Sequence, residues 1–227
     1  MHLRKSIDAI EACIAAAYVD RPVGFWALVP VAALMVSWLI NFYGNWIVSS
    51  YGHSWDEYPF FLSILFTSAY IVSGTFAFAK MGKSRNKLSS ICLYAWACLM
   101  LFVYICGTYV MTVHWIFISD LNIGDFLNIA NIIAQVSLIA FLVLRFKKTS
   151  TYKLPLMVGL AGVVVRLVNI LTCCYYYGIF ACNSIPQVGW HLLPLIIYWA
   201  HVLLMATSFV LMFFASRKLE KKRVGQC

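Results

Sequence analysis

The residue with the clearest capacity for chemistry is an arginine inside an otherwise apolar stretch. Arg166 lies near the middle of a long apolar run, and Asn169 follows three residues later, on the same face of a helix. An ionisable group inside a membrane is costly, and it usually faces the interior of a helix bundle or an aqueous cavity. We therefore expect Arg166 to contact an anion or a lipid headgroup.

A second set of polar side chains recurs at helical spacing in the preceding apolar run. Asn128, Asn131 and Gln135 share one helix face, and Asp125 lies at the outer end of that run. We expect Arg166 to reach toward these amides and Asp125, in a polar cluster that opens to the lumen. The alternative is that the amides form interhelical hydrogen bonds that only hold a bundle together.

The remaining polar candidates are two asparagines and the histidines. Asn41 and Asn45 lie one turn apart in the outer half of the first apolar run, and we place them in the same cluster. His191 and His201 are separated by about 15 Å along a helix, so they cannot share a metal ion. We expect no metal or cofactor, and we expect His201, near Tyr198, to form a hydrogen bond between helices.

Cysteines suggest one disulfide bond. Cys173 and Cys174 are adjacent near the outer end of the fifth apolar run, and Cys182 follows in the next connection. A lumen is oxidising, so a bond from Cys182 to Cys174 or Cys173 is chemically reasonable. The alternative is that the vicinal pair only fills space. Three further cysteines are expected to provide apolar packing inside the membrane: Cys92, Cys98 and Cys106.

The elements that must position these residues are membrane-spanning helices. The chain is 63% hydrophobic and 11% charged, with a mean hydropathy of +0.85, which is too apolar for a soluble domain of 227 residues. A helix needs roughly 20 apolar residues to cross a bilayer, and the backbone there must be hydrogen-bonded internally. The sequence thus predicts an all-α polytopic membrane protein, a bundle of six transmembrane helices: Trp26–Ser49, Pro59–Ala79, Leu88–Val113, Phe126–Leu144, Leu154–Tyr176 and His191–Ser216.

Basic residues predict the orientation. All the lysines and arginines except Arg166 fall into four clusters: near the N-terminus, after the second and fourth predicted helices, and in the C-terminal tail. Because such residues are retained in the cytosol, both termini should be cytosolic. We expect a cytosolic segment at 1–25, either an interfacial helix or a polar leader, a membrane domain at 26–216 and a basic tail at 217–227. The basic loops should meet anionic membrane lipids, and the clusters do not indicate a nucleic-acid partner.

Several short motifs resemble a known family. The first predicted helix and the connection after it contain Val29-Pro30, Ser37-Trp38, Gly52-His53, Tyr58-Pro59-Phe60 and Ser63. The last predicted helix and the residue before it contain Trp190-His191 and Tyr198-Trp199. This arrangement resembles the Frag1/DRAM/Sfk1 family of six-span membrane proteins. The chain departs from the family pattern in a shorter first luminal connection and in lacking the acidic residue of the last helix.

The resemblance implies a Golgi, endoplasmic-reticulum, endolysosomal or plasma-membrane protein that is linked to autophagy or to lipid handling. Our first hypothesis is a non-enzymatic regulator of autophagy or membrane-lipid organisation, with other membrane proteins as further partners. The alternatives are a factor that remodels lipids or glycosylphosphatidylinositol anchors, as an enzyme or an enzyme subunit with a luminal headgroup site, and a small transporter or channel. We expect no catalytic residue, although the motifs leave an enzymatic role open.

Overall fold

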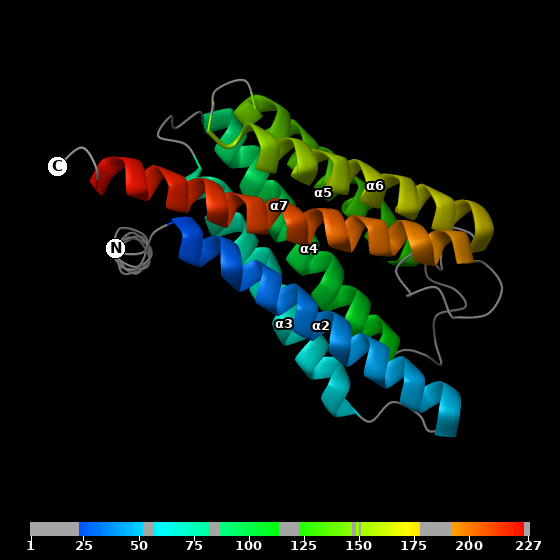
Figure 1. Cartoon of the computed structure of the whole chain (residues 1–227). Helices are drawn as coiled ribbons and strands as arrows, with labels where there is room; N and C mark the ends of the chain where they lie inside the picture. The colour runs from blue at the N-terminus through cyan, green and yellow to red at the C-terminus, as the bar shows by residue number, and fades with distance from the viewer. Residues whose placement is uncertain are drawn as a thin grey trace, which may run out of the picture.

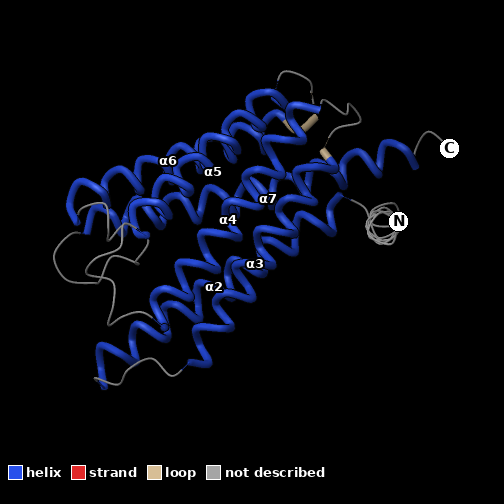
Figure 2. The backbone as a smooth tube through the Cα atoms, turned by 180° about the vertical axis from the view of Figure 1, so that it is seen from behind, coloured by secondary structure: helices blue, strands red, loops and turns tan. Residues whose placement is uncertain are grey.

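The fold is a bundle of long α-helices (Figure 1). The computed structural model describes residues 23–51, 57–81, 87–113, 123–146, 149, 151–177 and 192–224. Within these ranges there is no β-strand (Figure 2), which confirms the predicted all-α class. The helices are α2 (Val23–Tyr51), α3 (Glu57–Lys80), α4 (Lys87–Val113), α5 (Ile123–Phe146), α6 (Lys153–Tyr177) and α7 (Leu192–Val224).

Prolines mark where several helices begin. Pro59, Pro155 and Pro194 are each the third residue of their helix, in α3, α6 and α7. In the first turn a proline removes an N–H that has no partner within the helix, so it is tolerated there. Pro30 lies inside α2, where the helix continues through it.

Helix α7 is longer than hydropathy predicts. It continues to Val224 and so includes most of the basic segment that we had assigned to a tail after Ser216. The added residues are mainly lysine, arginine, leucine and glutamate, which are favourable in helices, and glycine appears only at position 225.

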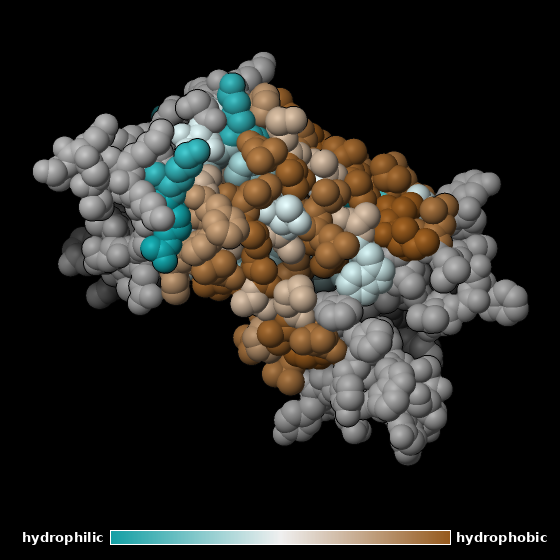
Figure 3. All heavy atoms as spheres, in the orientation of Figure 1, coloured by the Kyte–Doolittle hydropathy of each residue, from teal (hydrophilic) through white to brown (hydrophobic). Residues whose placement is uncertain are grey.

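The surface of the bundle is suited to lipid. Four helices are long and apolar enough to cross a membrane, over Lys87–Gly107, Phe126–Phe146, Lys153–Thr172 and Ile196–Lys218. Shorter apolar stretches in α2 and α3 cover Gly24–Ser37 and Ile64–Lys80 within the part of each helix that was searched. Brown, hydrophobic side chains cover the middle of the face in Figure 3. The chain is therefore an integral membrane protein, and α2 and α3 lie beside helices that cross the bilayer.

The six helices form a closed ring. Each helix packs against its neighbours in the chain, and α2 also packs against α7, which joins the first described helix to the last. This closure is tight near the start of α2, where a Cβ added at Gly24 would lie 2.8 Å from Ser216 Oγ and 3.1 Å from Phe213. Figure 1 shows α2 and α7 side by side at this end and diverging toward the other.

The described cations gather at one end of the ring, with Arg166 as the exception. They lie at or near helix ends: Lys80, Lys87, Arg145, Lys153, Arg217 and Lys218. Several are held against aromatic rings, as Lys80 is over Trp26 at 5.8 Å and Arg217 over Phe213 at 5.5 Å. We call this the basic end, and the rule for basic residues predicts that it faces the cytosol.

Glycines allow α6 and α7 to approach closely. A Cβ added at Gly162 would lie 3.1 Å from Met205 Sδ and 3.2 Å from Leu204 Cβ. A Cβ added at Gly159 would lie 2.9 Å from Ser208 Oγ, which donates a 2.8 Å hydrogen bond to the carbonyl of Pro155. Small residues at such contacts let helix backbones pack without a hydrophobic driving force.

We predict that Gly162→Val lowers the thermal stability of the purified protein. Its side chain would force apart two packed helices, and overpacking of this kind costs about 1–3 kcal/mol. Ala161→Val is the matched control, because Ala161 is exposed on the adjoining face of the same helix. Thermal unfolding followed by tryptophan fluorescence checks this, and equal midpoints for the two variants would contradict the packing described here.

Candidate functional site

Arg166 faces the interior of the ring. Val164 and Val168 are exposed at 43% and 46%, on the side of α6 that faces lipid. Arg166 is two residues from each, so it lies about 200° around the helix from both, on the opposite face. Its side chain is nevertheless only half-buried. The arginine therefore faces inward without being fully enclosed.

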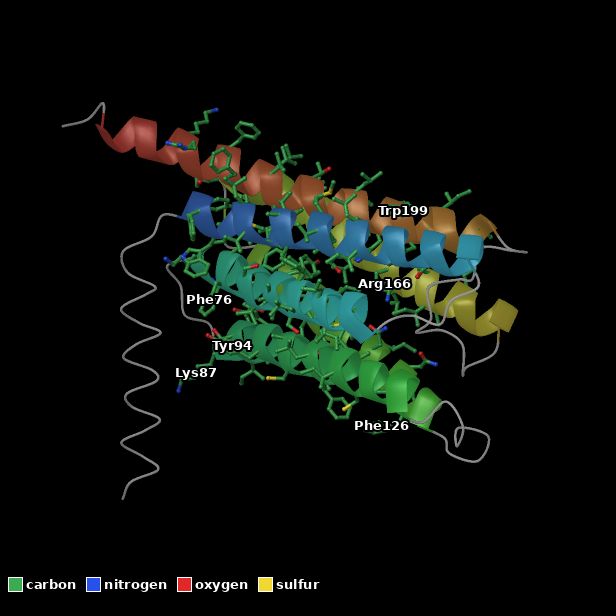
Figure 4. The ribbon with its side chains drawn as sticks, turned by 90° about the horizontal axis from the view of Figure 1, so that it is seen from below. Phe76, Lys87, Tyr94, Phe126, Arg166 and Trp199 are labelled. Atoms are coloured by element: carbon green, nitrogen blue, oxygen red, sulfur yellow. The ribbon has the colours of Figure 1, made fainter. Side chains whose placement is uncertain are left out.

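The described partners of the guanidinium are an amide and an aromatic ring. Arg166 Nη1 donates a 2.8 Å hydrogen bond to Oδ1 of Asn169, which is buried. The guanidinium carbon lies 5.5 Å from the centroid of the Tyr198 ring on α7, a cation–π contact. Figure 4 places Arg166 among the helices, away from the ends of the bundle. A guanidinium has five N–H donors, so these contacts leave most of them available for a ligand.

Tyrosines connect two further helices to this group of residues. Tyr70 on α3 is 7% exposed and interacts electrostatically with Arg166, Tyr198 and Tyr104 of α4. Tyr198 in turn interacts with both Tyr104 and Arg166. Phenolic hydroxyls both donate and accept hydrogen bonds. Tyr70 and Tyr198 therefore lie near enough to the guanidinium to interact with its charge, and Tyr104 lies near these two tyrosines.

His201 links the site to the contact between α6 and α7. Its Nδ1 lies 2.8 Å from the carbonyl oxygen of Gly162, and a carbonyl can only accept, so Nδ1 carries the proton in this hydrogen bond. His201 also interacts electrostatically with Arg166. This confirms the sequence prediction that His201 forms a hydrogen bond between helices.

The amides of α5 form a buried group of their own. Asn128, Asn131 and Gln135 are 2–3% exposed. Gln135 Nε2 donates to Asn131 Oδ1 at 3.1 Å and lies 3.2 Å from Met100 Sδ of α4. The shared face that we predicted is thus buried, and one of its contacts joins two helices. The expected approach of Arg166 to these amides stays a prediction, because the hydrogen bond described for its guanidinium goes to Asn169.

Polar groups from most helices lie at one level of the bundle. Ser37 of α2 and Thr67 of α3 share a buried 2.9 Å hydrogen bond. Counting about 1.5 Å per residue from the basic end, these two residues, Tyr70, Gln135 and Arg166 lie roughly 15–21 Å into the bundle. Tyr198 and His201 join them through their contacts with α6. We call the set the polar layer: Ser37, Thr67, Tyr70, Gln135, Arg166, Asn169, Tyr198 and His201.

The positive charge in this layer has no acidic residue at its own level. The chain has eight aspartates and glutamates, and in the described helices they occur only near helix ends. Asp125, the third residue of α5, has its backbone roughly 12 Å farther from the basic end than that of Arg166, at 1.5 Å per residue. An amide and an aromatic ring stabilise the guanidinium but do not neutralise it, so the layer is suited to an anion.

Several predicted site residues have side chains outside the described set. This applies to Asp125 in α5, to Asn41 and Asn45 in α2, and to Cys173 and Cys174 in α6. Cys182 lies outside the described residues, so the disulfide bond stays a prediction. The membrane cysteines Cys92, Cys98 and Cys106 are free thiols.

Sequence reasoning missed Tyr70 and Tyr104. Both lie in apolar helices rich in aromatic residues, where a tyrosine at helical spacing is interpreted as a packing residue. The approach of Tyr70 to Arg166, and of Tyr104 to Tyr70 and Tyr198, depends on how α3 and α4 sit against α6 and α7. A buried tyrosine needs a hydrogen-bond partner, and that was the only available signal.

Comparison with known proteins adds no relative: no family model, no curated protein and no solved structure matches this chain. The resemblance to the Frag1/DRAM/Sfk1 family therefore rests on the quoted motifs alone.

We predict different unfolding midpoints for two substitutions at Asn169. Asn169→Leu should lower the unfolding midpoint, because it removes the acceptor from a membrane-embedded cation, a loss of about 1–3 kcal/mol. Asn169→Asp should raise the midpoint relative to Asn169→Leu, because a carboxylate would pair with Arg166. Thr172→Val is the control, since the Thr172 hydroxyl bonds only to the carbonyl of Val168 on its own helix. Thermal unfolding in detergent measures all three, and similar midpoints for the Leu and Asp variants would contradict this role of Asn169.

Proposed function

We propose that this protein is a multi-pass membrane factor that organises membrane lipids by binding the anionic group of a lipid at Arg166. The observation that carries the proposal is the inward-facing, half-buried Arg166 in the polar layer. Arginine binds phosphate and carboxylate with two parallel hydrogen bonds, and such charge-assisted bonds are stronger in a low-dielectric environment.

The surroundings of Arg166 are suited to a headgroup with hydroxyl or phosphate oxygens. Tyr70 and Tyr198 supply hydroxyl groups near Arg166, and Asn169 holds one edge of the guanidinium. An acyl chain would meet the apolar surfaces of the same helices. A free, fully hydrated ion would gain less, because it would lose its water without burying an apolar part.

The resemblance to the Frag1/DRAM/Sfk1 family supports a regulatory role in an endomembrane or in the plasma membrane. A factor that holds an anionic lipid could alter autophagy or the handling of glycosylphosphatidylinositol lipids without cutting a bond. The described residues of the polar layer include no carboxylate, and Nδ1 of their one histidine, His201, is engaged by the carbonyl of Gly162. We therefore favour a lipid-binding factor over a hydrolase.

The direct test measures lipid binding to the purified protein. Phosphatidic acid, added to the protein in detergent, should quench or shift the tryptophan fluorescence, whereas phosphatidylcholine should not. Arg166→Gln should weaken the binding of phosphatidic acid by roughly 10- to 100-fold, because a charge-assisted hydrogen bond contributes about 1.5–3 kcal/mol and 1.4 kcal/mol is a factor of ten. Arg166→Lys should retain part of the affinity.

Arg217→Gln is the matched control, because it removes an exposed cation at the basic end and leaves the polar layer unchanged. Equal loss in both variants would mean that phosphatidic acid binds the basic end, which would contradict the proposal. So would unchanged affinity in a folded Arg166→Gln variant.

A further inference from the structure

The interior of the ring is closed on the cytosolic side of Arg166. Phe78 of α3 lies at the centre of an aromatic cluster, with its ring centroid 5.1 Å from Phe209 of α7, 5.8 Å from Phe141 of α5 and 6.5 Å from Trp96 of α4. The three phenylalanines are 0% exposed and Trp96 is 2% exposed. We call these four residues the aromatic floor, because four helices meet in it and no accessible surface remains there.

The aromatic floor lies between the basic end and the polar layer. Phe78 is in the last turn of α3 and Phe141 is close to the end of α5, both near the cations of the basic end. Met205 and Met212 continue the sealed packing along α7, at 1% and 0% exposure. Tyr70 then connects the two levels, because its ring packs edge-on against Phe209 at 6.2 Å and its hydroxyl interacts with Arg166.

Beyond the aromatic floor, a few inward-facing side chains of α6 and α7 keep accessible surface, although others at this level, such as Asn131 and Asn169, are buried. Tyr198 and His201 lie two residues from the lipid-exposed Ile196 and Leu203, so they are about 200° away, on the inner face of α7. Both are half-buried, as is Arg166. Their accessible surface therefore belongs to the part of the ring that lies away from the basic end. In Figure 1 this is also the end toward which α2 and α7 diverge.

We propose that the Arg166 site is open from one side only: its anionic ligand enters from the non-cytosolic side, and the aromatic floor separates it from the cytosol. This inference rests on the proposed function for the presence of a ligand, but the closure itself does not depend on it. The ligand carries a phosphate or similar anionic group, from a lipid of the non-cytosolic leaflet or from a soluble anion of that compartment.

The physical basis is the contrast between the two levels. An anion crossing the aromatic floor would shed its hydration shell among apolar rings that offer no hydrogen-bond donor, which is costly. At the polar layer the same anion meets a guanidinium, tyrosine hydroxyls and an accessible surface. The protein thus binds an anion from one side of the membrane and blocks its passage to the other side.

Side-specific thiol labelling tests the closure. Tyr198→Cys, in a full-length chain whose native cysteines are replaced by alanine, is reconstituted in vesicles, and a C-terminal tag reports the orientation. A membrane-impermeant methanethiosulfonate should label Cys at this position only from the side opposite the basic end. Leu203→Cys, which faces lipid at 63% exposure, is the control and should react from neither side. Labelling of the Tyr198→Cys chain from the basic end, or from neither side, overturns the proposal.

Protection from labelling identifies the source of the ligand. The reagent is applied to the open side with phosphatidic acid confined to that leaflet, or with inorganic phosphate in that compartment. Protection by phosphatidic acid supports a lipid ligand, and protection by phosphate alone supports a soluble anion. If neither protects while labelling stays one-sided, the closure stands and the proposed function fails.

Opening the aromatic floor provides a second, independent test. Phe78→Ala in the same chain should make the Tyr198→Cys position reactive from both sides and should produce an iodide leak in vesicles that the wild type lacks. Phe141→Ala replaces it if Phe78→Ala does not fold. A leak through the wild type, or one-sided labelling in both folded variants, would show that these residues do not form the seal.

Discussion

The structure depends on the rule that polar atoms in a membrane must find partners within the protein. Hydroxyl groups obey it on their own helices: Thr75 donates to the carbonyl of Ile71, Ser137 to that of Ile133 and Thr172 to that of Val168. Because each is satisfied four residues back, these side chains need no neighbouring helix. Groups that cannot be satisfied in this way are instead turned into the ring, and they decide which helices must meet.

A guanidinium is the extreme case of such a group. Asn169, on the same helix, can satisfy one of the donors of Arg166, so the others require other helices or a ligand. Tyr198 comes from α7, the next helix in the chain, and Tyr70 from α3, which is distant in sequence from α6. The arginine therefore ties together the two halves of the chain, and its uncompensated charge leaves this junction responsive to an anion. Arg166 thus contributes both to the stability of the fold and to the proposed binding of an anion.

Hydropathy and helical spacing predict the parts of this fold that are local. They give the helices, the end where the cations gather, and the shared face of Asn128, Asn131 and Gln135, because each is a property of one segment. They do not give the closure of α2 against α7 or the approach of Tyr70 to Arg166, which depend on packing between segments far apart in sequence. The predicted span ends at Ser216, close to the end of the apolar stretch at Lys218, whereas the helix itself continues to Val224 because helix propensity does not depend on hydropathy.

The inner face of α6 explains why the charge of Arg166 lies at the level of the polar layer. Near the basic end, a Cβ added at Gly159 would lie 2.9 Å from Ser208, and one added at Gly162 would lie 3.1 Å from Met205. A long cationic side chain has no space at either position. One turn beyond Gly162, Arg166 has accessible surface and polar neighbours. The change from contacts that admit only glycine to a half-buried arginine occurs within a single turn of helix. The close packing of α6 and α7 and the polar layer beyond it are therefore two parts of one arrangement. The tight contact leaves no space for a long side chain, so the guanidinium lies one turn farther from the basic end.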